Sequence, residues 1–272
     1  MTFRSLLFVP GARPDRFEKA IASNTDAVCI DLEDAVAQAD KEAALASTMA
    51  YLSQPPSKGV VGLRINSLDD DQAARDIQAI LDHKAKPAFV MIPKAERAGD
   101  IEHVRAATKN NFPIWCLVET PQAVVDAPAI AAAIGENGGI VFGGVDYAAS
   151  IGAEMGWDSY VYARGCLVNA AAIAGCQLMD VPYLEVKDEA GLREETAGVK
   201  KIGFTGKACI HPAQIAPVNA VFTPTDEQVL AAERIVAAYN EAGGGVALLD
   251  GKLIEKPVLK SAKQILSRKE KS

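Results

Sequence analysis

Eight short apolar runs recur along the chain, and each is followed by polar residues and then by a stretch with helical spacing. The runs are almost continuously apolar, which is typical of parallel strands buried on both faces. We therefore predict eight parallel β-strands. They span residues 5–10, 27–32, 60–65, 88–93, 114–118, 139–143, 176–181 and 207–211.

The stretches between these runs have the apolar spacing of amphipathic helices. Alternation of eight strands with helices is typical of a (β/α)8 TIM barrel, and this α/β fold is our prediction. An open doubly wound sheet is the alternative arrangement of the same units. The predicted helices span residues 14–22, 34–52, 69–81, 100–108, 121–134, 159–174 and 188–200.

Two further helices are predicted after the eighth unit, at residues 226–241 and 258–268. We accordingly predict a barrel domain at residues 1–224 and a C-terminal helical extension at residues 225–272. The extension lies outside the eightfold repeat. It is expected to fold over its own barrel or, as a lid, to contact a neighbouring subunit.

Composition excludes several classes of protein. The chain has 272 residues, 49% of them hydrophobic, which is enough for one large core. A net charge of −7 argues against a nucleic-acid-binding protein, since such proteins are usually basic. The first apolar run is too short for a signal peptide, and no segment has the long uncharged stretch of a membrane span, so we expect a cytoplasmic protein. The five cysteines form no CxxC pair and are expected to be reduced.

Acidic residues follow the fifth and sixth predicted strands, at Glu119 and Asp146. The C-terminal ends of barrel strands meet at one face, where functional groups gather. Two carboxylates at this face would form an oxygen-only site that suits Mg²⁺, and the chain lacks the paired His or Cys ligands of a zinc site. The structural alternative is that Glu119 caps the helix predicted at residues 121–134 and that Asp146 caps a short turn.

Arg64 ends the apolar run VVGLRI. A buried strand rarely ends in arginine without an anionic partner. The partner is either a structural carboxylate such as Glu33 or a substrate carboxylate or thioester oxygen. The sequence pattern leaves both interpretations open.

The segment FVPGARPDRFEKA places a glycine turn before a helix that carries Arg13, Arg16 and Lys19. A helix N-terminus with basic side chains suits phosphate groups. A solvated basic face of the helix is the alternative.

Taken together, eight motifs resemble the citrate lyase beta-subunit-like proteins of the HpcH/HpaI aldolase family. Each motif alone is weak, but eight in order from Arg4 to Pro257 are specific. The resemblance implies a (β/α)8 barrel, a Mg²⁺ cofactor, a homotrimer and substrates such as citryl-, malyl- or citramalyl-coenzyme A. The short, stand-alone form of the chain favours a citramalyl-coenzyme A lyase. The motifs are RSLLFVPGARPDRFEKA, CIDLEDAV, LRIN, MIPKAE, VETPQAV, FGGVDYAASIG, GKACIHPAQI and GVALLDGKLIEKP.

The resemblance also assigns roles to individual residues. Glu119 and Asp146 match the magnesium ligands, and Glu119 is a substrate-binding residue as well. Arg64 matches the arginine that binds the substrate. The correspondences for the acyl-coenzyme A site are Phe8, Arg13 and Pro212.

The tail departs from the family pattern. In relatives that are coenzyme A lyases the tail motif ends in MID, and its aspartate acts as acid and base in the site of the neighbouring subunit. Here the motif reads LIE, so Glu255 stands at that position with one more methylene. Since proton transfer needs hydrogen-bond reach, Asp250 is a substitute candidate.

The implied activity is retro-Claisen cleavage of a short 3-hydroxyacyl-coenzyme A. Arg64 would stabilise the thioester enolate, and Glu255 or water would protonate it. The products would be acetyl-coenzyme A, or another short acyl-coenzyme A, and a 2-oxo acid. Three alternatives remain: an aldolase that acts on free pyruvate without coenzyme A, an accessory subunit of a larger citrate-lyase-like complex, and a non-catalytic binding protein.

Overall fold

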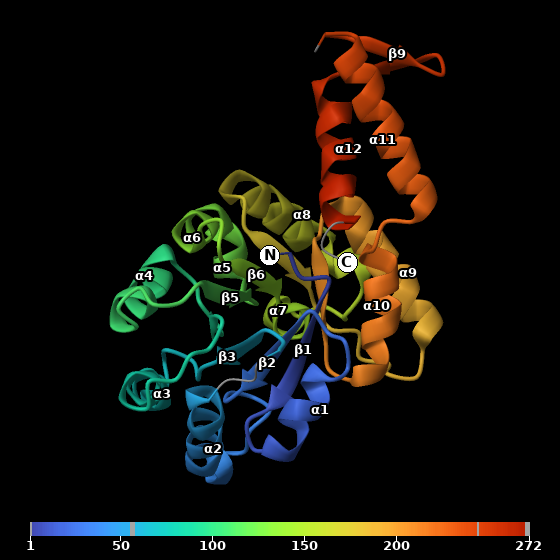
Figure 1. Ribbon diagram of the computed structural model, residues 1–272. Helices are drawn as coiled ribbons and strands as arrows, with labels where there is room; N and C mark the ends of the chain where they lie inside the picture. The colour runs from blue at the N-terminus through green and yellow to red at the C-terminus, as the bar shows by residue number, and fades with distance from the viewer. Residues whose placement is uncertain (1, 55–57, 244, 270–272) are drawn as a thin grey trace. The chain divides into compact units, whose positions relative to one another are not determined.

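The strands form a closed barrel in the computed structural model, which describes residues 2–54, 58–243 and 245–269 (Figure 1). Each strand pairs in parallel with the next one along the chain, and the eighth pairs with the first. This confirms the predicted (β/α)8 barrel and excludes the open sheet. The barrel strands are β1 (Ser5–Pro10), β2 (Ala27–Asp31), β3 (Val61–Arg64), β4 (Val90–Ile92), β5 (Ile114–Val118), β6 (Gly139–Phe142), β7 (Gln177–Asp180) and β8 (Gly206–Cys209).

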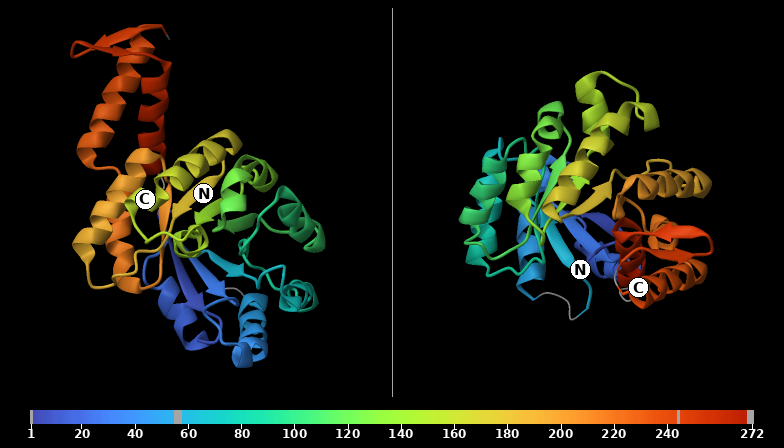
Figure 2. Two further views of the ribbon diagram at one scale, coloured as in Figure 1. Left: turned by 180° about the vertical axis from the view of Figure 1, so that it is seen from behind. Right: turned by 90° about the horizontal axis from the view of Figure 1, so that it is seen from above.

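The helices lie outside the ring of strands (Figure 2). A last helix of the repeat, α10 (Ile215–Phe222), follows β8. The other helices and helical turns of this part of the chain are η1 (Pro14–Arg16), α1 (Phe17–Ile21), η2 (Gln38–Asp40), α2 (Lys41–Ser53), α3 (Asp71–Asp82), α4 (Ala98–Ala107), α5 (Pro121–Val125), α6 (Ala127–Ile134), α7 (Gly144–Ile151), α8 (Trp157–Ala174), α9 (Glu189–Ile202) and η3 (Pro212–Gln214).

Two predicted helices differ from the observed ones for identifiable reasons. The helix expected from residue 34 begins at Lys41 instead, because the carboxylate of Asp31 accepts bonds from the backbone N–H groups of Glu33 and Ala35 and holds this segment in a turn. The helix expected at residues 121–134 is divided between α5 and α6. Pro128 lacks the N–H that would continue the helical bonding, so the break precedes it. The pattern also missed α7 and α10.

Aromatic side chains fill the amino-terminal half of the barrel. Phe3 stacks on Trp115 with their ring centroids 5.7 Å apart, and Phe89 packs against the same indole at 5.2 Å. Glycines make room for these rings, since a β-carbon on Gly62 would lie 2.2 Å from Phe89 and one on Gly139 would lie 2.7 Å from Trp115. The packed aromatic base confines any ligand site inside the barrel to its carboxyl-terminal mouth.

The chain divides into two compact units inside α10: the first is residues 3–219, and the second comprises Thr2 and the described residues from Ala220 onward. The second unit contains a small core around Tyr239, Ala247 and Ile254. Its two strands form an antiparallel hairpin that the apolar pattern does not predict. The Asp250–Gly251 turn has the positive φ angles of a tight hairpin. The elements of this unit are α11 (Asp226–Glu241), β9 (Ala247–Leu249), β10 (Lys252–Ile254) and α12 (Lys256–Lys269). Across the described residues, no helix combines the length and apolar character that a membrane crossing requires.

Candidate functional site

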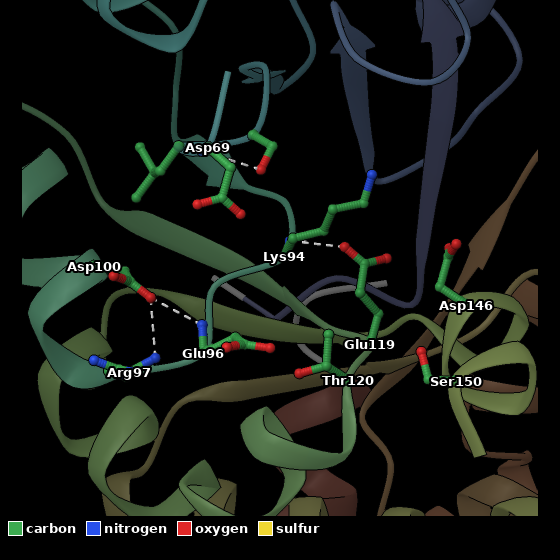
Figure 3. Close-up of a pocket in the computed structure, with 11 residues that line it drawn as sticks. Asp69, Lys94, Glu96, Arg97, Asp100, Glu119, Thr120, Asp146 and Ser150 are labelled. Carbon is green, nitrogen blue, oxygen red and sulfur yellow. Dashed lines mark hydrogen bonds between the residues drawn. The ribbon is translucent and has the colours of Figure 1, made fainter. Parts of the chain in front are cut away.

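Glu119 and Asp146 line one cavity of about 490 Å³ at the carboxyl-terminal mouth of the barrel (Figure 3). Glu119 directly follows β5, and its side chain continues the inward-facing series of Trp115 and Leu117. Asp146 is the third residue of α7, the helix that follows β6. The cavity is lined by Ser67, Leu68, Asp69, Lys94, Glu96, Arg97, Asp100, Glu119, Thr120, Asp146 and Ser150.

Glu119 is tightly constrained. Its Oε1 accepts a bond of 2.7 Å from the backbone N–H of Lys94. On its other side, a β-carbon on Gly143 would lie 2.7 Å from Oε2 and 2.4 Å from the Glu119 β-carbon. The close approach of β5 to the start of α7 therefore requires glycine at this position, and it fixes the direction of the carboxylate.

The electrostatics of the two acids favour a bound cation. Burial raises the pKa of Glu119 to about 7, and the nearby charge of Asp146 adds to the rise, although the N–H of Lys94 opposes it. The described residues contain no cluster of three or more His, Cys, Asp or Glu side chains arranged to hold a metal. A cation held by this pair alone would take the rest of its shell from water and ligand oxygens, as Mg²⁺ commonly does.

The structural alternative for Glu119 is wrong. The N-cap of α5 is Thr120, whose hydroxyl oxygen accepts the backbone N–H of Ala123 at 3.1 Å. Glu119 therefore does not cap α5, and its side chain faces the cavity. Asp146 lies in the first turn of α7, where a negative charge also interacts favourably with the helix dipole, so it has a structural contribution beside any functional one.

Arg64 lies at the end of β3 and is paired with buried acids. Its Nε and Nη2 donate to the two carboxylate oxygens of Asp31 at 2.6 and 2.5 Å, and Nη1 lies 2.9 Å from Glu33. Burial disfavours the charged guanidinium, but the bonds to Asp31 outweigh it and raise the pKa of Arg64. The guanidinium also lies over the ring of Phe8, 5.2 Å from its centroid. The main structural partner of Arg64 is therefore Asp31, with Glu33 second.

Lys94 is the principal residue of this site that was not predicted from the sequence. It follows β4 and adopts a left-handed backbone conformation with φ of 51°. Its ammonium lies 2.8 Å from Glu33 and 3.7 Å from Asp34, while its backbone N–H binds Glu119. The motif MIPK shows a lysine at a strand end, but nothing in the motif indicates this backbone conformation.

The other predicted residues have different surroundings. Phe8 packs under Arg64, but Arg13 is exposed and paired with Asp15 at 2.9 Å, and neither lines the cavity of Glu119. Pro212 is exposed and begins η3 after β8. Glu255 is exposed in the second unit, immediately before α12. In the same unit the substitute candidate, Asp250, is paired with Arg234 at 2.9 Å.

The cysteines are all free thiols, as expected. Burial raises the pKa of Cys29, of Cys116 and of Cys209, which disfavours a nucleophilic thiolate at these positions.

Comparison with known proteins identifies the family of the chain. A family model described as HpcH/HpaI aldolase/citrate lyase matches residues 4–212, and a second, described as a C–C bond lyase of the TIM-barrel fold, matches residues 164–271. The chain is 37% identical over 277 residues to a (3S)-malyl-CoA thioesterase of Cereibacter sphaeroides, covering 98% of this chain and 95% of that protein. It is 32% identical to the mitochondrial citramalyl-CoA lyase of Rattus norvegicus, covering 97% and 85% of the two chains.

A solved structure of similar fold extends the comparison. Protein CitE from Mycobacterium tuberculosis, in complex with magnesium, acetoacetate and coenzyme A, has a TM-score of 0.84 and 31% sequence identity. The match covers 99% of this chain and 98% of that one. Together with the closed barrel, these similarities show that the chain belongs to the HpcH/HpaI aldolase/citrate lyase family and is a carbon–carbon lyase.

Proposed function

We propose that this protein is a Mg²⁺-dependent lyase that cleaves a short 3-hydroxyacyl-coenzyme A into acetyl-coenzyme A, or another short acyl-coenzyme A, and a 2-oxo acid. Candidate substrates are the citramalyl, malyl and citryl thioesters. The observation that carries the proposal is the pair Glu119 and Asp146 on one cavity. The similar CitE structure, which holds magnesium with acetoacetate and coenzyme A, supports the ligand class.

Glu119 and Asp146 would hold the metal. Their mutual charge and the burial of Glu119 disfavour two bare carboxylates, so a divalent cation would relieve the repulsion. A bound Mg²⁺ would supply Lewis-acid polarisation of the hydroxyl and of the forming keto oxygen. The bond from the N–H of Lys94 would hold the Glu119 carboxylate in one direction for the metal.

Arg64 would stabilise the negative oxygen of the thioester enolate. The nitrogen available for this role is Nη1, which now lies beside Glu33, because the other two nitrogens bind Asp31. The guanidinium is held at its edge by two hydrogen bonds to Asp31, and its face lies over the ring of Phe8. The cation is therefore oriented before a substrate binds. Phe8, Arg13 and Pro212 are proposed to contact the acyl-coenzyme A.

Glu255 is proposed as the base and acid of the reaction, acting from a neighbouring subunit of a homotrimer: it would accept the proton of the substrate hydroxyl, directly or through water, and deliver it to the enolate carbon. Its exposed position before α12 leaves the carboxylate accessible, and Asp250 is less suited because Arg234 already binds it. The C-terminal extension, residues 225–272, would then serve as a lid over the site of the next subunit. A cytoplasmic location completes the proposal.

Thioester hydrolysis is the second candidate activity. The 37% identity to a (3S)-malyl-CoA thioesterase over nearly the whole chain favours it specifically. The same carboxylates and the same arginine would then bind a thioester that water attacks at its carbonyl carbon, releasing coenzyme A and a free hydroxy acid.

One assay separates these activities. The purified protein is incubated with Mg²⁺ and a panel of 3-hydroxyacyl-coenzyme A thioesters, and acetyl-coenzyme A, free coenzyme A and 2-oxo acid are quantified together. Equal amounts of acyl-coenzyme A and 2-oxo acid indicate the lyase, whereas free coenzyme A without 2-oxo acid indicates the thioesterase. Turnover of pyruvate with an aldehyde but of no thioester would instead support the coenzyme A-independent aldolase, and complete inactivity would favour the accessory subunit.

A further inference from the structure

The cavity that contains Glu119 and Asp146 is strongly acidic. Five carboxylate side chains and two basic side chains belong to its lining. A substrate that carries a carboxylate would meet repulsion here unless a cation lies within reach. The acids are Asp69, Glu96, Asp100, Glu119 and Asp146, and the bases are Lys94 and Arg97.

Arg64 is poorly placed to provide that cation for a second substrate anion. Arg64 is only 8% exposed. Its Nε and Nη2 bind Asp31, and its Nη1 pairs with Glu33. Even when Nη1 leaves Glu33 for one substrate oxygen, as proposed above, the fork to Asp31 has no further nitrogen to offer. Even with the proposed Mg²⁺ on Glu119 and Asp146, the lining keeps three other acids against two bases, which favours a further cationic contact for the substrate carboxylate.

Lys94 has the accessibility that Arg64 lacks. Its side chain is 39% exposed, and it extends along the cavity beside the Glu119 carboxylate (Figure 3). Its partner Glu33 is shared with Nη1 of Arg64, so when the 2-oxo acid binds without a thioester enolate, the ammonium can leave Glu33 while Nη1 stays paired with that acid. Arg97, in contrast, lies beside Asp100, away from Asp146 (Figure 3).

The backbone and the side chain of Lys94 make separate contacts: the backbone N–H binds Glu119, and the ammonium binds Glu33. The left-handed conformation turns the N–H toward Oε1 of Glu119, and this bond does not depend on the side chain. The ammonium can thus change its partner while the carboxylate of Glu119, the candidate metal ligand, stays in place. A flexible four-carbon stem with a compact charge suits such an exchange better than a planar fork.

We propose that Lys94 is a substrate-binding residue whose ammonium exchanges Glu33 for the carboxylate of the 2-oxo acid moiety. The inference rests on the proposed function, since it names the group that binds one part of the proposed substrate. Glu33 then remains paired with Arg64 in the complex with the 2-oxo acid alone, where no thioester enolate engages Nη1.

Direct binding of the product tests the proposal. Titration calorimetry measures the affinity of the Mg²⁺-saturated protein for pyruvate and for glyoxylate, with no thioester present. We expect Lys94→Met, which keeps the backbone N–H, to weaken binding at least about tenfold. Lys94→Arg should recover part of the loss. Arg97→Met, the matched loss of the other basic side chain of the cavity, should change the affinity less than about threefold.

A double variant distinguishes contact with the ligand from a structural effect. If Lys94→Met acted by leaving Glu33 unbalanced, then Glu33→Gln combined with Lys94→Met would restore binding, whereas loss of a direct contact leaves binding weak. Restored binding in the double variant, or wild-type affinity in Lys94→Met, would overturn the inference alone. If the wild-type protein binds neither 2-oxo acid, the proposed function fails and this inference fails with it.

Discussion

Both carboxylate oxygens of Asp31 are bound by Arg64, with Nε at 2.6 Å and Nη2 at 2.5 Å. Asp31 is 1% exposed, so the pair is shielded from water. This arrangement needs the planar fork of arginine, because an ammonium can occupy only one position between the two oxygens.

Arg64→Lys should therefore lower both activity and stability. We expect kcat/KM to fall at least tenfold, about 1.4 kcal/mol of transition-state stabilisation, and the free energy of unfolding to fall by about 1–3 kcal/mol. Steady-state kinetics and urea unfolding measure the two effects. The matched control is Arg4→Lys, because Arg4 holds Asp26 with the same fork at the opposite end of the barrel. That variant should keep its kcat/KM, and a lysine variant at 64 with near-normal kinetics would show that Arg64 has no catalytic role.

Metal binding can be tested at Asp146. Asp146→Asn keeps the size of the side chain but removes a charge at an exposed position, so the fold should survive. We expect Mg²⁺ affinity, measured by titration calorimetry, to fall at least about tenfold, and kcat to fall with it. Asp69→Asn removes a charge from the lining of the same cavity and should affect Mg²⁺ much less. Equal losses in the two variants would point to a diffuse acidic surface rather than a metal site.

Metal removal gives a second test of the same centre. Treatment with EDTA should abolish cleavage, and added Mg²⁺ or Mn²⁺ should restore it, because the two oxygen ligands suit either hard cation. Full activity in protein shown to be metal-free would exclude the magnesium mechanism.

The glycine next to Glu119 predicts a steric effect. Gly143→Ala would place a β-carbon 2.4 Å from the β-carbon of Glu119, so the acid or α7 must shift. We expect a loss of about 1–3 kcal/mol in unfolding free energy and a fall in Mg²⁺ affinity. Gly165→Ala, in the middle of α8 with open space at its β-carbon, should be neutral or stabilising by about 0.5–1 kcal/mol. Normal metal binding by Gly143→Ala would show that the direction of Glu119 is not critical.

Complementation between inactive variants tests the shared site. If Glu255 acts in the site of a neighbour, Glu255→Gln and Asp146→Asn should each lack activity, while hetero-oligomers made by co-expression regain part of it. The cleavage rate of the mixture is compared with that of each parent. Hetero-oligomers as inactive as both parents would exclude action between subunits, and full activity of Glu255→Gln alone would assign the proton transfer to water or Asp250.

The fold was predictable because buried parallel strands appear in the sequence as apolar runs. The meeting of Glu119 and Asp146 followed from the same argument, since neighbouring strands end at one face. The run CIDLEDAV offers three acids, however, and only the register of β2 with β3, which places Asp31 opposite Arg64, selects Asp31 as the main partner. The contribution of Lys94 depends on a backbone angle that no residue pattern encodes.

The inner face of β5 carries Trp115, Leu117 and then Glu119, so about 13 Å of one strand separates the aromatic base from the acid. A substitution at the last inward position would therefore leave the aromatic packing at the base of the barrel in place. Trp115 and Leu117 thus contribute to the core, whereas Glu119 contributes to the cavity. A search for the natural substrate should accordingly compare relatives at these strand-end positions, because residues there line the cavity and do not pack in the core of the barrel.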